Sequence, residues 1–331
     1  MYSHNLILEP VTKRVRLYTL GKGFNMASSE VYQAASAGEP LDIILPTHGK
    51  LEEMTTPCVQ ALYANTRNQF HLIVIDSSTP DMDEGKDKTP EFFKRLQIEH
   101  NNITFMHSDT GFRNGNQFFN IALLQCKYRF VATVMNSVRV EPDWDIVPLQ
   151  MMADNPKIGI IGMKCLMGHN GLIESAGIKM HGVLPCDMGR DFPSHRLSGS
   201  YPCFSVQWAF ALLRKEAVVG NLDENIWQGH VGWDDIDNSI YLRYKGWECW
   251  YCGLGVAYHF THATRGSDEN EALLKNRMNA EIFYKRWGYW EQFKKENPYA
   301  PEFYLDGKIQ FLARADDLPL VQKDSLLQAE T

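Results

Sequence analysis

Short apolar runs alternate with segments of helical spacing from residue 41 onward. The first run covers residues 41–45 and is followed by Pro46, and the second covers residues 71–75. Runs of this length that are rich in β-branched residues and do not alternate with polar positions are typical of buried parallel strands. Two similar runs, at 103–106 and 129–135, bring the strands expected in this part of the chain to four.

The segments between these runs predict helices. Apolar residues recur with helical spacing at 52–66, and further helices are expected at about 90–100 and 117–126. Strands that alternate with helices in this way predict an α/β fold with a largely parallel sheet and right-handed crossovers. Ligands of such sheets bind beyond the carboxyl ends of the strands. The segments at those ends are 46–50, 76–79, 111–116 and 136–139.

The second half of the chain is less regular. A strand is expected at 157–163, and residues 168–200, which are rich in Gly, Pro, His and Asp, predict a long functional loop or a small hairpin. A helix is expected at 235–245. The last helix, at about 269–295, is unusually aromatic, and we expect Gly288 to kink or break it.

Composition and charge narrow the class of protein. With 331 residues, of which 44% are hydrophobic, the chain is long enough for one large α/β domain or two small ones. Its formal net charge of −7 argues against a broad basic surface for nucleic acid. The longest apolar runs fall far short of the roughly 18 residues of a membrane span, and the first residues lack the features of a signal peptide. We therefore expect a cytoplasmic protein without a membrane span.

The seven cysteines are scattered along the chain and odd in number, which favours reduced thiols over a disulfide framework. Cys249 and Cys252 form a CxxC pair. A structural zinc site would need a second pair of ligands at suitable spacing, which the sequence does not provide. We expect these two cysteines to be buried structural residues.

Four stretches of the sequence indicate a family. Residues 41–48 are an apolar run ending in Pro-Thr-His, and residues 73–78 read Ile-Val-Ile-Asp-Ser-Ser. Residues 232–237 read Gly-Trp-Asp-Asp-Ile-Asp and open a helix that ends in Lys-Gly-Trp, and residues 256–259 read Val-Ala-Tyr-His. In this order and spacing they resemble the family 2 glycosyltransferases, the inverting enzymes of the GT-A fold. The resemblance implies a Rossmann-like α/β fold with a mixed, mostly parallel sheet flanked by helices.

The resemblance also divides the chain into parts. Residues 1–40 would form an N-terminal extension, 41–265 the GT-A domain, and 266–331 a C-terminal helical extension. Within the GT-A domain, residues 41–140 are expected to bind the nucleotide and 141–265 the acceptor.

The resemblance implies a nucleoside-diphosphate sugar as the donor, with a UDP-sugar the leading expectation. Asp76, at the end of the second strand, would accept a hydrogen bond from the base, and Thr47 would bond to the ribose or a phosphate. Alternatively, Asp76 forms the turn of the sequence Asp-Ser-Ser-Thr-Pro. The residues assigned to the nucleotide are Pro46, Thr47, His48, Asp76, Arg113, Asn136 and Ser137.

The expected metal site departs from the family pattern. The fourth strand of these enzymes ends in Asp-x-Asp or Asn-x-Asp, whose last aspartate binds the cation that holds the diphosphate, and here Val138 stands at that place. His259 remains as a candidate metal ligand, or is simply packed at a strand end, so Mn²⁺ or Mg²⁺ would bind poorly. Asn136 could assist through water, or basic side chains could hold the diphosphate instead. The basic candidates are Arg113, Arg139, Lys164 and Arg265.

Inverting transfer needs a base that takes the proton of the acceptor hydroxyl. The resemblance assigns this role to Asp235, with Asp234 beside it, and adjacent acids repel, which raises at least one pKa. The alternative is that these acids cap the following helix. We expect Trp208, Trp233 and Asp237 to contact the sugar or the acceptor, although tryptophans are more often core residues and Asp237 could also be a capping residue.

The sequence therefore predicts a glycosyltransferase that moves a sugar to a hydroxyl acceptor with inversion and with weak or absent metal dependence. The acceptor would be a glycan or another hydroxyl compound, and the acidic charge disfavours nucleic acid. The rival hypothesis is a non-catalytic nucleotide- or carbohydrate-binding protein on the same scaffold, for which Val138 is the main argument. A nucleotidyltransferase would need a Gly-rich basic loop directly after the first strand, and residues 46–52 are a poor version of one.

Overall fold

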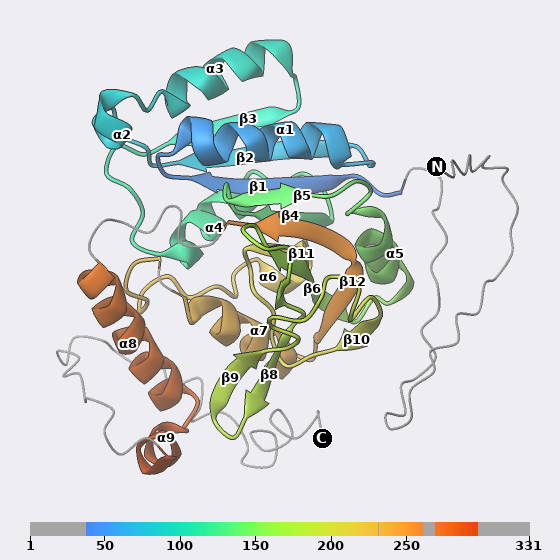
Figure 1. Cartoon of the computed structure of the whole chain (residues 1–331), viewed down its shortest axis with the longest axis vertical. Coiled ribbons are helices and arrows are strands. Elements are labelled where there is room, and N and C mark those ends of the chain that lie inside the picture. The colour runs from blue at the N-terminus through green and yellow to red at the C-terminus, as the bar shows by residue number, and fades with distance from the viewer. Residues whose placement is uncertain (1–37, 231, 261–268, 297–331) are drawn as a thin grey trace, which may run out of the picture.

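The computed structural model describes residues 38–230, 232–260 and 269–296, and one large sheet dominates this part of the chain (Figure 1). Its parallel strands lie in the order β4-β1-β2-β3, and the four strands predicted from the sequence are confirmed. Their bounds are β1 Leu41–Thr47, β2 Phe70–Asp76, β3 Ile103–His107 and β4 Phe130–Val134. β1 does not stop at Pro46, because Pro46 and Thr47 still pair with the end of β2.

The second half of the sheet is mixed. β6 (Ile158–Met167) and β12 (Glu248–His259) are parallel to each other, and β11 (Phe210–Arg214) runs antiparallel between β6 and β4. Three short strands pair antiparallel with β12 or β6: β5 (Val138–Val140), β7 (Ile173–Ser175) and β10 (Ser200–Pro202). The result is the mixed, mostly parallel sheet that the sequence predicts.

Helices cover both faces of the sheet, which explains why the strand sequences are apolar throughout. Leu41, Ile43 and Leu45 belong to the core on one face, which includes residues of α1, α3 and α5. Ile44 belongs to the core on the other face, which includes residues of α4, α6 and α7. The bounds are α1 Thr56–Asn65, α3 Thr89–Glu99, α4 Gly115–Leu123, α5 Ile146–Asp154, α6 Lys215–Val218 and α7 Asp234–Tyr244.

Some elements differ from those expected. The helix predicted at 52–66 begins with a π-helical turn, η1 (Leu51–Thr55), before α1. The short helix α2 (Met82–Gly85), helix α5 and strand β5 were not predicted. The region 168–200 was predicted to be a long loop or a small hairpin. It contains a small separate hairpin of β8 (Ile178–His181) and β9 (Leu184–Asp187).

The aromatic helix is divided as expected. α8 (Glu269–Arg286) and α9 (Trp290–Glu296) are separated by Gly288, whose φ of 74° is in the left-handed region that favours glycine. Aromatic residues of α8 form a third core cluster with Trp227 and Trp233, which precede α7. The C-terminal helices thus pack against the segment that leads into α7, at the left and lower left of Figure 1.

Two further expectations concern cysteines and membranes. The seven cysteines all lie in the described residues and are free thiols, and both Cys249 and Cys252 are buried. Within the described ranges, no helix is long and apolar enough to cross a membrane.

Candidate functional site

The carboxyl ends of β1, β2 and β3 meet at a buried carboxylate. Asp76 is fully buried, and its Oδ1 accepts hydrogen bonds from Oγ1 of Thr47 (2.7 Å) and Oγ of Ser78 (2.6 Å). Its Oδ2 lies 2.7 Å from Nδ1 of His107, whose Nε2 lies 2.9 Å from Oδ1 of the exposed Asp109. Asp76 therefore ties three strand ends together.

Residues 111–116, which the sequence places at the next strand end, lie at the amino end of α4. Asn114 caps this helix, because its Oδ1 accepts from the N–H of Gln117 (3.1 Å). Its Nδ2 donates to the carbonyls of Glu224 (2.8 Å) and Trp227 (3.2 Å). The neighbouring Arg113 is largely exposed and lies 3.4 Å from the carboxylate of Glu224. These contacts bring the segment 224–230 onto the amino end of α4.

Two adjacent acids lie at the start of α7. The turn before them uses left-handed φ values at Gly232 (94°) and Trp233 (78°), and a tryptophan seldom adopts that conformation. Asp234 Oδ2 packs against Gly115 so closely that a Cβ at position 115 would lie only 2.5 Å from it. Glycine at 115 therefore makes room for this carboxylate beside α4.

Burial and mutual repulsion perturb both acids. Burial raises the pKa of Asp234 to about 6, and the charge of Asp237 adds to the rise. The pKa of Asp235 is raised to about 7, mainly by burial and also by repulsion from Asp234 and Asp187. Backbone hydrogen bonds from Ile236 and Trp208 act in the opposite direction and lower it. A carboxylate with a pKa in this range accepts a proton readily near neutral pH.

Asp187 is a member of the site that the sequence did not reveal. It lies on β9, and its Oδ1 accepts from Nε2 of Gln207 (3.0 Å), next to Trp208. Burial also raises the pKa of Asp187. Because the hairpin that carries Asp187 is distant in sequence from α7, no spacing pattern could have paired it with Asp235.

Of the three expected sugar or acceptor contacts, Trp208 and Asp237 are buried and Trp233 is partly buried. Trp208 is buried and packs edge-on against Phe119 of α4, with ring centroids 5.5 Å apart. The Trp233 ring lies against Phe283 of α8 (5.2 Å). Asp237 is fully buried, and its Oδ1 accepts from Nε1 of Trp287 (2.8 Å) and lies 3.3 Å from Nε of Arg286. This arrangement favours positioning roles, and direct contacts remain predictions.

Val138, the first residue of β5, has a structural role after the end of β4. Val138 pairs with His259 across the β5–β12 ladder, so the two positions expected at the metal site are neighbours. The Val138 side chain is fully buried and belongs to the core that contains Val140 and Trp144. Before it, Asn136 donates to Oγ1 of Thr55 (3.2 Å), and the carbonyl of Ser137 accepts from the N–H of Phe260 (3.0 Å).

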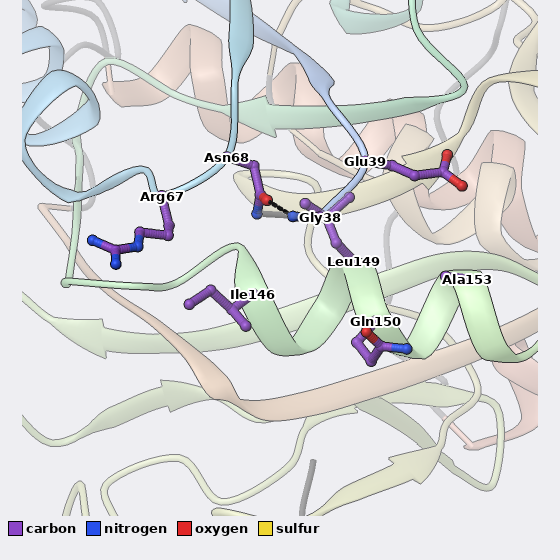
Figure 2. Close-up of a pocket in the computed structure, with 8 residues that line it drawn as sticks. All are labelled: Gly38, Glu39, Arg67, Asn68, Ile146, Leu149, Gln150 and Ala153. Carbon is purple, nitrogen blue, oxygen red and sulfur yellow. Dashed lines mark hydrogen bonds between the residues drawn. The ribbon is translucent and has the colours of Figure 1, made fainter. Parts of the chain in front are cut away.

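A small pocket lies at the other edge of the sheet. Figure 2 shows it between the residues that precede β1 and β2, where Asn68 accepts a hydrogen bond from the N–H of Gly38, and helix α5. Its remaining lining residues are Glu39, Arg67, Ile146, Leu149, Gln150 and Ala153. It lies at the amino ends of the strands, so we assign it no part in the site.

Solved structures resemble this arrangement. GalNAc-T7, solved with UDP, GalNAc and Mn²⁺, is 13% identical and aligns over 84% of this chain with a TM-score of 0.63. Residues 1–349 of S. aureus TarS, solved with UDP-GlcNAc, are 14% identical and align over 87% of this chain and 70% of theirs, with a TM-score of 0.53. The fold is that of the GT-A glycosyltransferases. The chain matches no family model and no curated protein. It spans about half, 54%, of the GalNAc-T7 chain.

The GT-A fold raises the question of a metal ion. Nδ1 of His259 lies 2.9 Å from Oε2 of the buried Glu174, an arrangement that orients metal-binding histidines in many proteins. However, nowhere in the described residues do three His, Cys, Asp or Glu side chains come together as a metal site. With a core valine at position 138, the described residues do not fit a tightly held cation.

The basic residues proposed to replace a metal are mostly engaged elsewhere. Arg139 donates to the carbonyls of Asn136 (2.8 Å) and Glu53 (2.9 Å), and Lys164 donates to the carbonyls of Ser194 (3.0 Å) and Arg196 (2.8 Å). Both side chains therefore stabilise neighbouring loops through hydrogen bonds to backbone carbonyls. Arg265 lies outside the described residues, which leaves the exposed Arg113 from the predicted set.

Proposed function

We propose that this chain is a glycosyltransferase that moves a sugar from a nucleoside-diphosphate sugar to a hydroxyl acceptor. The observation that carries the proposal is the acid pair at the start of α7, on a GT-A fold, with the pKa of Asp235 raised to about 7. A non-catalytic binder has no need of two repelling carboxylates in a partly buried site.

In the proposed reaction, Asp235 takes the proton of the acceptor hydroxyl as its oxygen attacks the anomeric carbon. The bond from that carbon to the diphosphate breaks, and the diphosphate leaves with the electron pair. Attack from the side opposite the leaving group inverts the anomeric configuration. Asp234 holds negative charge beside Asp235 and strengthens it as a base, and Gly115 leaves the space for this arrangement.

The donor is proposed to be a UDP-sugar, bound at the carboxyl ends of β1 to β4. Two similar structures contain UDP or UDP-GlcNAc, which supports this choice. The uracil ring of the donor would lie over the hydrogen-bonded residues around Asp76, where the exposed His48 is hydrogen-bonded to Ser77. The residues proposed to contact the nucleotide are those assigned from the sequence: Pro46, Thr47, His48, Asp76, Arg113, Asn136 and Ser137.

The acceptor is proposed to be a glycan or another hydroxyl compound, bound on the side of the β8–β9 hairpin and α7. We also propose little or no dependence on a divalent metal. Val138 packs in the core and offers no ligand, so the charge of the leaving diphosphate must be met by other groups.

Release of UDP tests the proposal without knowledge of the acceptor. The protein is incubated with a panel of UDP-sugars in EDTA, and UDP and free sugar are measured. Slow hydrolysis of one donor is expected, because transferases with a bound donor and no acceptor pass the sugar to water. Proton NMR of the released sugar should show the inverted anomer as the first product. Donor binding without release of UDP under any condition would favour the non-catalytic binder.

The pH dependence follows from the raised pKa values. We expect kcat/KM to fall as the pH drops through about 7 to 6, because protonation of the Asp234–Asp235 pair removes the base. In an Asp187→Asn variant the fall should shift to lower pH, since one repelling charge near Asp235 is gone. The exposed Asp154, which accepts from Gln150, provides the control: Asp154→Asn should leave the profile unchanged. A profile flat between pH 5 and 8 would contradict the assignment of the base.

A further inference from the structure

Three groups that can carry positive charge come from distant parts of the chain, and the charges of two of them act on the third, His230. They are His48, which follows β1, His230, which lies in the segment before α7, and Lys275 of α8. The Lys275 side chain packs on the residue before His230, so that a Cβ at Gly229 would lie 3.2 Å from its Cδ and 3.9 Å from Nζ. None of the three belongs to the basic residues that the sequence suggested for the diphosphate.

Hydrogen bonds hold both imidazole rings in defined orientations. Nε2 of His230 lies 3.0 Å from the carbonyl oxygen of Phe112, which can only accept, so Nε2 carries a proton. The His230 ring also stacks on Phe118, with centroids 5.7 Å apart. Nδ1 of His48 lies 3.0 Å from Oγ of Ser77, which can donate or accept, and 3.2 Å from the carbonyl oxygen of the same residue. Nδ1 of His230 can gain a proton, and Nε2 of His48 can carry one, so each can donate to an anion.

Without a ligand, the positive charges of His48 and Lys275 disfavour protonation of His230. Desolvation lowers the pKa of His230, and the positive charges of His48 and Lys275 lower it further, although the bond to Phe112 opposes this. Two carboxylates balance neighbouring cations: Glu271 lies 2.6 Å from Lys275, and Glu224 lies 3.4 Å from Arg113. No ion pair between a carboxylate and either His48 or His230 is found in the described part of the chain.

We propose that His48, His230 and Lys275 form an anion site that holds the diphosphate of the donor in place of a metal ion. This inference rests on the proposed function and adds to it the groups that meet the leaving-group charge. The site lies beside the nucleotide segments, since His230 bonds to Phe112 and His48 to Ser77. A bound diphosphate would favour the protonated form of His230 and offset the repulsion from the neighbouring positive charges.

Binding of UDP, uridine and inorganic pyrophosphate, measured by calorimetry in EDTA, tests the site. His230→Gln and Lys275→Met should each weaken UDP and pyrophosphate binding by about tenfold, the effect of one charge-assisted hydrogen bond, and leave uridine binding unchanged. Lys157→Met, at an exposed lysine beyond the amino end of β6, is the matched control and should bind all three as the wild type does.

NMR of the histidine ring protons gives an independent readout. Pyrophosphate should shift the resonances of His48 and His230 and raise the pKa of His230, and UDP should displace it. UDP affinity unchanged in both variants, or pyrophosphate that stays bound when UDP is added, would overturn the site while leaving the proposed function standing. Pyrophosphate that shifts the histidines of a protein that binds neither uridine nor UDP would support an anion site and refute the proposed function.

Discussion

The Asp235→Asn variant is expected to lose transferase turnover by about 10²- to 10⁴-fold, the usual contribution of a general base. Its affinity for the UDP-sugar should change little, because Asp235 is proposed to act on the acceptor hydroxyl. The amide has nearly the shape of the carboxylate and can still accept from the N–H of Ile236. Turnover with a saturating donor and acceptor, together with calorimetric donor affinity, separates the two effects.

Unfolding cannot explain this expected loss. The pKa of Asp235 is raised in the folded protein above its ordinary value of 3.8, so the stability that this group contributes is fully present below that value and is lost as the pH rises through about 7. At pH 8, Asp235→Asn should therefore be at least as stable as the wild type. Asp154→Asn again serves as the control. Wild-type turnover by Asp235→Asn would remove Asp235 from the mechanism.

The second large effect is expected at Asp237. Replacing Asp237 with alanine should lower the free energy of unfolding by about 2–3 kcal/mol, because the indole N–H of Trp287 loses its acceptor and Arg286 loses one of its two carboxylates. Arg286 keeps its bond to Asp223 (2.9 Å), so the segment before α7 would stay attached to α8 at one point. Chemical denaturation at a fixed pH measures the change.

The same variant distinguishes two roles for Asp237. If it only contacts the acceptor, Asp237→Ala should raise KM for the acceptor without changing stability, which would contradict the structural role. An Asp237→Leu, Arg286→Met double variant serves as a further test. It removes both charges of this pair, while Asp223 loses its partner, and it should be less unstable than the sum of the single changes. A double variant as unstable as the sum of the single changes would mean that the pair is not coupled.

The strands could be predicted because both faces of the sheet are covered. Residues such as Ile43 and Ile44 are buried on opposite faces, so the run is apolar throughout, a pattern local in sequence. Helix α5 was missed because its residues are largely apolar and include Pro148, so they form no clear stripe. The break at Gly288 was predicted because glycine is the residue that favours a left-handed φ.

The site was predicted less completely, because its contacts join distant segments. The acids at 234 and 235 could be found from their motif, but not the packing of Asp234 on Gly115, which sets the space for them. Val138 pairs with His259 across the β5–β12 ladder, and only the structure shows its side chain in the core. Glu174 and Asp187 come from short strands whose sequences carry no chemical pattern. His230 and Lys275 meet only because α8 packs against the segment before α7.

Calorimetric titration of the wild-type protein with UDP, GDP and several UDP-sugars, each in EDTA and in Mn²⁺, tests the central claim most directly. We expect UDP and at least one UDP-sugar to bind in EDTA, with affinities that Mn²⁺ changes little, and GDP to bind more weakly. Binding that requires Mn²⁺ would contradict the metal-independent site. No binding of any nucleotide in either condition would contradict the assignment of a nucleotide-sugar transferase.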